Sequence, residues 1–124
     1  MSTAPYGMEV IIDLAECDPL TFTRERIEAY MAGLCDVIDM QREDLHFWDY
    51  NSPEEKAAAP AQLKGTSAVQ FILTSNITLH SLDDLRTCYI NIFSCKDFDP
   101  GVAAEFTRNA FGANSCSYAV LERG

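Results

Sequence analysis

The sequence predicts an α+β fold, a two-layer sandwich in which two helices pack on one face of a mostly antiparallel sheet. Three observations support this fold class. Short segments rich in β-branched residues recur along the chain, two other stretches carry helical apolar spacing, and several strand-like segments follow one another with only short turns between them. The 124 residues suffice for one hydrophobic core, so we expect a single domain spanning residues 1–124.

The first half of the chain is predicted to hold two strands and one helix. Residues 8–14 are rich in β-branched side chains and suit a strand, and residues 45–50 suit a second one. Between Thr21 and Ile38 the apolar residues recur at the spacing of one helix face, which we expect to enter the core. These residues are Ile27, Tyr30, Met31, Leu34 and Ile38.

The polar, alanine-rich residues 51–64 are predicted to form a long surface connection with room for one helical turn. Further strands are predicted at 66–73, 76–80, 87–95 and 115–122, with a turn at 81–86.

The second helix is marked at both ends. Asp99 is suited to cap it, Pro100 fits its first position, and Gly112 is suited to terminate it. We expect its inner face to consist of Val102, Ala103, Phe106 and Ala110.

Charge and hydropathy exclude several classes of partner. The formal net charge is −10 and the nine Lys and Arg residues are scattered, so we expect no nucleic-acid partner. No apolar run reaches the roughly 18 residues of a membrane helix, and the N-terminus lacks the basic and apolar regions of a secretory signal. We therefore expect a cytoplasmic protein with no membrane partner.

The cysteine and histidine content predicts no metal site. The five cysteines are odd in number and form no C-x-x-C pair, so neither a disulfide framework nor a zinc motif is indicated. In a reducing compartment we expect most of them to be core residues and one to be chemically active. They are Cys17, Cys35, Cys88, Cys95 and Cys116, and the only histidines are His46 and His80.

Four polar residues are candidates for chemistry. By pattern alone Ser67, Ser75, His80 and Cys95 fit either a catalytic site or ordinary strand and core positions. Their spacing resembles that of the bacterial and archaeal S-adenosylmethionine decarboxylases, which are pyruvoyl enzymes. In that family a serine opens a strand, with a histidine five positions on, a cysteine twenty positions on and another serine eight positions before. The likeness covers about residues 7–122 and includes the opening "YGMEVIIDLAECD".

The resemblance implies a proenzyme that cleaves itself between Thr74 and Ser75. The Ser75 hydroxyl would attack the Thr74 carbonyl, and elimination followed by hydrolysis would leave a pyruvoyl cofactor where Ser75 stood. His80 is implied as the processing base, because imidazole titrates near neutrality, and Ser67 as its assistant. The pyruvoyl carbonyl would then form a Schiff base with the substrate amine, and Cys95 would return the proton after loss of CO₂.

The departures from the family pattern lie around the implied substrate pocket. Thr74 stands where the family usually has Glu, Leu82 where it has an aromatic residue, and Asp84 where it has another Glu. Leu82 and Asp84 are therefore implied substrate contacts, together with Thr78, which shares a strand face with His80.

Three functions follow in order of preference. The first is decarboxylation of S-adenosylmethionine for spermidine synthesis by a homodimer of processed chains, as family members associate as dimers. The second keeps the chemistry but uses a basic amino acid such as arginine or ornithine. The third is an unprocessed homologue that acts as a partner or regulator of another chain.

Overall fold

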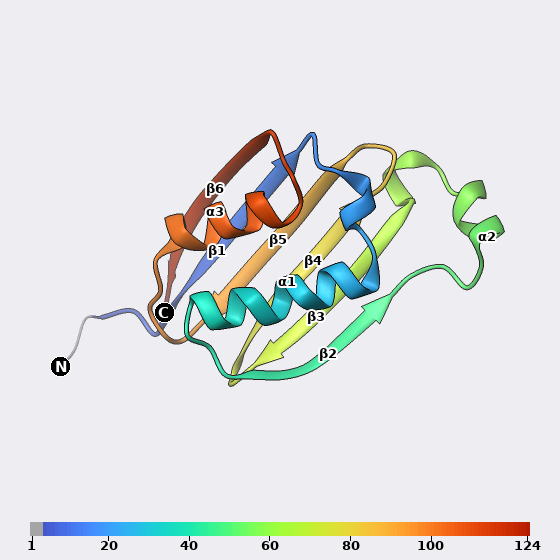
Figure 1. Cartoon of the computed structure of the whole chain (residues 1–124). Coiled ribbons are helices and arrows are strands. Elements are labelled where there is room, and N and C mark those ends of the chain that lie inside the picture. The colour runs from blue at the N-terminus through green and yellow to red at the C-terminus, as the bar shows by residue number, and fades with distance from the viewer. Residues whose placement is uncertain (1–3) are drawn as a thin grey trace.

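Six antiparallel strands form the sheet on which the helices pack (Figure 1). The computed structural model describes residues 4–124, and its strands lie in the order β2-β3-β4-β5-β1-β6. All five pairings between neighbouring strands are antiparallel, so the predicted α+β class is confirmed. The strands are β1 Gly7–Ala15, β2 Arg42–Trp48, β3 Gly65–Ile72, β4 Ser75–Leu82, β5 Thr87–Ser94 and β6 Ser115–Arg123.

Two long helices cover one face of this sheet. Figure 1 shows α1, Arg24–Val37, and α3, Pro100–Ala110, lying across the same side, as predicted. A third, short helix, α2, Pro53–Ala58, lies away from them in the connection between β2 and β3. Within the described residues, no helix is long and apolar enough to cross a membrane.

The helix α1 follows its predicted pattern but begins later than predicted. All five residues of its predicted inner face are at most 5% exposed, so that face is confirmed. The helix starts at Arg24 because the Thr23 hydroxyl accepts a hydrogen bond from the Arg26 N–H and so caps it. The residues before Thr23 form a separate 3₁₀ turn, Pro19–Thr21, which Asp18 caps.

The ends of α3 are confirmed, whereas its predicted inner face is partly wrong. The buried residues are Ala103, Ala104 and Thr107, and Val102 is 47% exposed. Thr107 is accommodated in the core because its hydroxyl donates to the Ala103 carbonyl at 2.7 Å and contacts the Tyr30 hydroxyl at 2.8 Å. The pairing of these two hydroxyls joins α3 to α1, and Val102 faces solvent.

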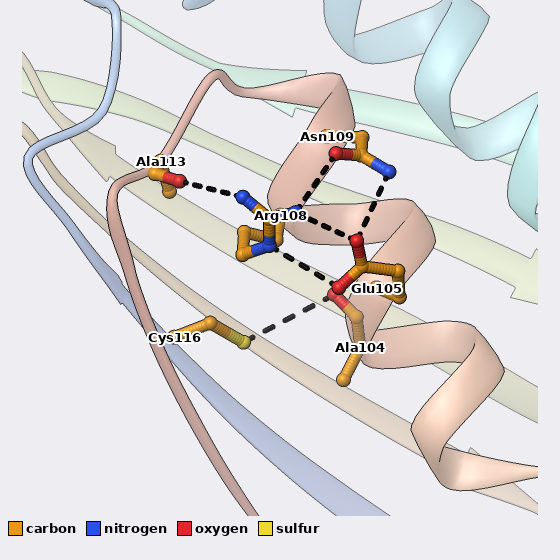
Figure 2. A network of polar contacts seen from close by, with 6 residues as sticks. All are labelled: Ala104, Glu105, Arg108, Asn109, Ala113 and Cys116. Carbon is orange, nitrogen blue, oxygen red and sulfur yellow. Dashed lines mark hydrogen bonds and ion pairs between the residues drawn. The ribbon is translucent and has the colours of Figure 1, made fainter.

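A polar network fixes the connection from α3 to β6. Figure 2 shows Arg108 between the Glu105 carboxylate, at 2.6 Å, and the Ala113 carbonyl, at 3.3 Å. Gly112, with φ of +58°, reverses the chain at the end of the helix. Cys116 lies beside this network at the start of β6, with its Sγ 4.0 Å from the Ala104 carbonyl oxygen.

The strand β2 begins three residues before the predicted 45–50 segment and ends at Trp48. Its pairing with β3 is shifted by an irregularity between Arg42 and Leu45. Gln70, which is fully buried, fills this irregularity. Its amide donates to the carbonyls of Glu43, Asp44 and Phe71 at 2.7 to 3.2 Å and accepts a bond from Arg42 Nε at 2.8 Å.

The sheet face opposite the helices carries a different set of side chains. Along β4 the inward residues are buried, whereas Asn76, Thr78, His80 and Leu82 alternate onto the other face. The strand continues to Leu82, so the turn predicted at 81–86 is confined to its last four residues. We call this second side the open face, and it carries His80 and its surroundings.

Candidate active site

The predicted cleavage point lies at the tip of the β3–β4 hairpin. Ile72 pairs with Ser75, so Leu73 and Thr74 form a two-residue loop. Thr74 has a φ of +54°, in the left-handed region that β-branched residues rarely adopt. A backbone held in this region costs on the order of 1–3 kcal/mol, and such strain is concentrated at functional sites.

The end of β5 brings Cys95 to the same hairpin. The Cys95 N–H donates to Ser75 Oγ at 3.2 Å, and the Cys95 Sγ lies 3.4 Å from Thr74 Oγ1. Ser75 is nearly buried, whereas Cys95 is exposed. We call Thr74, Ser75 and Cys95 the hairpin cluster. It joins three of the residues that the sequence singled out.

The thiol in this cluster differs from the other thiols of the chain. Hydrogen bonds from Thr74, then Ser75 and Tyr6, lower the pKa of Cys95 from its ordinary value. Burial instead raises the pKa of Cys17 and of Cys35 to about 11, and that of Cys88 also well above the usual range. Cys95 is therefore the thiol most ready to ionise, and the prediction that most cysteines lie in the core is confirmed.

Ser67 and His80 form a second group at the other end of the hairpin. They are directly opposite each other on β3 and β4, and Ser67 Oγ lies 2.8 Å from His80 Nδ1. An open pocket of about 430 Å³ surrounds them, which we call the His80 pocket. Its apolar wall is formed by Trp48, Tyr50, Leu63 and Leu82.

The structure does not bring His80 to Ser75 within one chain. The two residues are five positions apart on the same extended strand. At a rise of about 3.3 Å per residue they are separated by about 16 Å. The hairpin cluster and the His80 pocket therefore lie at opposite ends of β4, and we call them the two candidate half-sites.

The three predicted substrate contacts lie in different places. Leu82 lines the His80 pocket, and Thr78 lies on the open face between the two half-sites. Asp84 is bound by Lys64, whose Nζ lies 2.8 Å from the carboxylate. The ion pair between Lys64 and Asp84 was not predicted, because nothing in the sequence links two residues that are twenty positions apart.

The sequence also gave no reason to expect Tyr6 near the thiol. Tyr6 precedes β1, stacks on Phe93 with ring centroids 6.4 Å apart, and hydrogen-bonds to Cys95. Among residues 4–124, no three or more His, Cys, Asp or Glu side chains gather where they could bind a metal ion.

Comparisons with known proteins show the fold and the family of this chain. A crystal structure of the adenosylmethionine decarboxylase from Aquifex aeolicus has the same fold, with a TM-score of 0.78 at 17% identity over 98% of this chain and 93% of that chain. The S-adenosylmethionine decarboxylase proenzymes of Bacillus velezensis and Anoxybacillus flavithermus are each 33% identical to this chain over 61 residues, or 49% of its length. The match spans about half of these curated relatives, 48% and 49% of their lengths.

The sequence model of the family described as S-adenosylmethionine decarboxylase matches residues 8–124, which is nearly the whole chain. This match includes both half-sites and every strand except the first residue of β1. The chain therefore belongs to the S-adenosylmethionine decarboxylase family.

Proposed function

We propose that this chain is a proenzyme that cleaves itself between Thr74 and Ser75 and then decarboxylates S-adenosylmethionine, supplying the product for spermidine synthesis. The observation that carries the proposal is the hairpin cluster. A serine follows a strained peptide unit and lies beside an exposed thiol of lowered pKa. Membership of a family of pyruvoyl-dependent proenzymes supports the same chemistry.

The strain at Thr74 favours the first step of cleavage. Attack of Ser75 Oγ on the Thr74 carbonyl carbon forms an ester, and the peptide bond breaks to release the Ser75 amine. A base then removes the Ser75 Cα proton, and the Thr74 carboxylate leaves. Hydrolysis of the resulting enamine expels ammonia and leaves the pyruvoyl group at the head of residues 75–124. Opening the strained loop relieves its conformational cost as the bond breaks.

Cys95 is the group best placed to return a proton during decarboxylation. The pyruvoyl group supplies an electron sink when it is in place, and the chain supplies an acid beside it. The backbone N–H of Cys95 binds Ser75 Oγ, so the thiol is held next to the residue from which the pyruvoyl group would derive. A thiol is able to act as an acid near neutral pH.

We infer that two copies of the chain complete each active site. The roughly 16 Å between Ser75 and His80 is too long for proton transfer within one chain. Packing the open faces of two copies together would carry the His80 pocket of one copy toward the hairpin cluster of the other. The open face has apolar side chains for such an interface. They include Ile11, Phe71, Tyr89 and Leu121, which are 36–48% exposed.

The His80 pocket favours S-adenosylmethionine over a basic amino acid. Trp48 and Tyr50 form an edge-to-face pair, with ring centroids 5.1 Å apart, and Leu63 and Leu82 extend this apolar wall. A wall of this kind suits a flat nucleobase, for which arginine and ornithine have no counterpart. The pairing of Asp84 with Lys64 leaves less carboxylate available for a cationic side chain.

Self-cleavage is tested by intact-mass analysis of the purified chain over time. We expect two fragments, residues 1–74 and residues 75–124, with the second blocked at its N-terminus. Ser75→Ala removes the attacking oxygen, so that variant should stay at full length. A wild-type chain that remains a single full-length species after prolonged incubation contradicts the proposal and favours a regulatory role.

Turnover is tested by CO₂ release from S-adenosylmethionine, arginine and ornithine. We expect release from S-adenosylmethionine alone, and a loss of about 100-fold or more in Cys95→Ala, which lacks the proton donor. Cys95→Ala should still cleave, because the thiol takes no part in the ester step. Cys116→Ala is the matched control, since Cys116 lies behind α3 and should turn over normally. Unimpaired turnover in Cys95→Ala would remove Cys95 from the mechanism.

A further inference from the structure

We propose that Thr74 is a positioning residue, whose hydroxyl holds the Cys95 thiol beside the Ser75 peptide bond. This inference rests on the proposed function, because it concerns the same cleavage point and the same proton donor. It assigns a task to the Thr74 side chain, whereas cleavage by itself uses only the Thr74 carbonyl.

The first support is the conformational cost that Thr74 bears. Four non-glycine residues of the described chain have positive φ, and Thr74 is the only β-branched one among them. The tip of a two-residue hairpin loop is ordinarily occupied by Gly, Asn or Asp, which adopt this conformation with less strain. A threonine here indicates that its side chain makes a contact that glycine does not provide.

The second support is that contact itself. Thr74 Oγ1 donates to the Leu73 carbonyl oxygen at 2.8 Å and lies 3.4 Å from Cys95 Sγ, so its hydroxyl proton is within reach of the sulfur when the thiol ionises. On the other side, the Cys95 backbone N–H is fixed by Ser75 Oγ at 3.2 Å. The two residues that flank the predicted scissile bond therefore hold Cys95 at two points, its sulfur and its backbone nitrogen.

Hydroxyl groups, rather than a cation, surround the Cys95 thiol and favour its ionisation. Tyr6 contributes a further hydrogen bond from the segment before β1. Lys96 is the neighbouring cation, but its ammonium is bound to the Asp39 carboxylate at 2.6 Å. Ionisation of Cys95 thus depends on nearby hydroxyl groups, and Thr74 contributes the largest of their effects on its pKa.

The test measures how fast iodoacetamide alkylates Cys95 as a function of pH, in the full-length Ser75→Ala chain. This background does not cleave, so every variant is compared in the same uncut state. Thr74→Val preserves the β-branched shape and loses only the hydroxyl. We expect its alkylation midpoint to rise by about 0.5 pH unit, which lowers the rate below the midpoint about threefold. Peptide mass analysis assigns the modification to Cys95 and uses Cys116 as an internal reference.

Thr74→Ser is the matched control, because it keeps the hydroxyl and should retain the original midpoint. Thr74→Ala serves as a second hydroxyl-free variant if valine unfolds the hairpin, as judged by circular dichroism. Equal midpoints for the hydroxyl-free and hydroxyl-bearing chains overturn the role of Thr74. This outcome is independent of the proposed function, which fails separately if the wild-type chain never cleaves.

Discussion

Chains carrying Ser75→Ala or His80→Ala, each expected not to cleave alone, are expected to regain self-cleavage when they are mixed or co-expressed. The cleaved species should be the His80→Ala chain, since it retains Ser75 and would receive His80 from the other copy. The reason is the separation of the two half-sites, because about 16 Å of extended strand lies between Ser75 and His80. Tags of different mass on the two chains identify which one is cut.

The control for this experiment replaces the Ser75→Ala chain by the double variant Ser75→Ala/His80→Ala. No copy in that mixture supplies His80, so the His80→Ala chain should stay intact. A His80→Ala chain that cleaves by itself at the wild-type rate excludes His80 from processing. Mixed dimers that form without any cleavage exclude the shared site.

Gln70→Leu is expected to destabilise the fold by about 2–4 kcal/mol in urea unfolding. The leucine fills a similar volume but leaves the carbonyls of Glu43, Asp44 and Phe71 without the amide donor that they share. Because Gln70 is fully buried, a leucine there places an apolar side chain against carbonyls that have lost their donor. The bulge in β2 should therefore be the first part of the sheet to lose its pairing.

The same substitution at an exposed glutamine provides the comparison. Gln62 lies on the surface beside the His80 pocket, so Gln62→Leu should change the free energy of unfolding by less than about 0.5 kcal/mol. If Gln70→Leu changes the free energy of unfolding as little as Gln62→Leu does, the buried amide contributes no net stability. Burial of the leucine side chain would then offset the lost hydrogen bonds.

The elements of the fold follow from local chemistry that the sequence displays. The apolar spacing of α1 places Ile27, Met31 and Leu34 on one face, and that face is buried in the core. Asp99 and Gly112 fix the ends of α3 because capping and chain reversal depend on single residues. The strands were recognisable for the same reason, through their β-branched residues.

Features that depend on contacts between distant residues were not predictable in this way. The first residues of β2 are hydrogen-bonded to the side chain of Gln70, which lies on another strand. The burial of Thr107 on α3, rather than of Val102, goes with the contact between its hydroxyl and that of Tyr30, 77 residues away in the sequence. The predicted strand over residues 76–80 already implied that Ser75 and His80 lie apart, but the contact of Ser75 with Cys95 depends on the pairing of β4 with β5, which the sequence does not display.

The strand order determines how the two products of self-cleavage would be held together. The cut would divide the chain into one piece with β1, β2 and β3 and another with β4, β5 and β6. In the sheet, β1 lies between β5 and β6, so the first piece is inserted into the second. Maturation would therefore convert one folded chain into two chains that share one sheet and one core. Because β1 is paired on both sides with strands of the other piece, separating the two chains would require unfolding. A reactive chain end could thus be created inside the sheet without releasing either product.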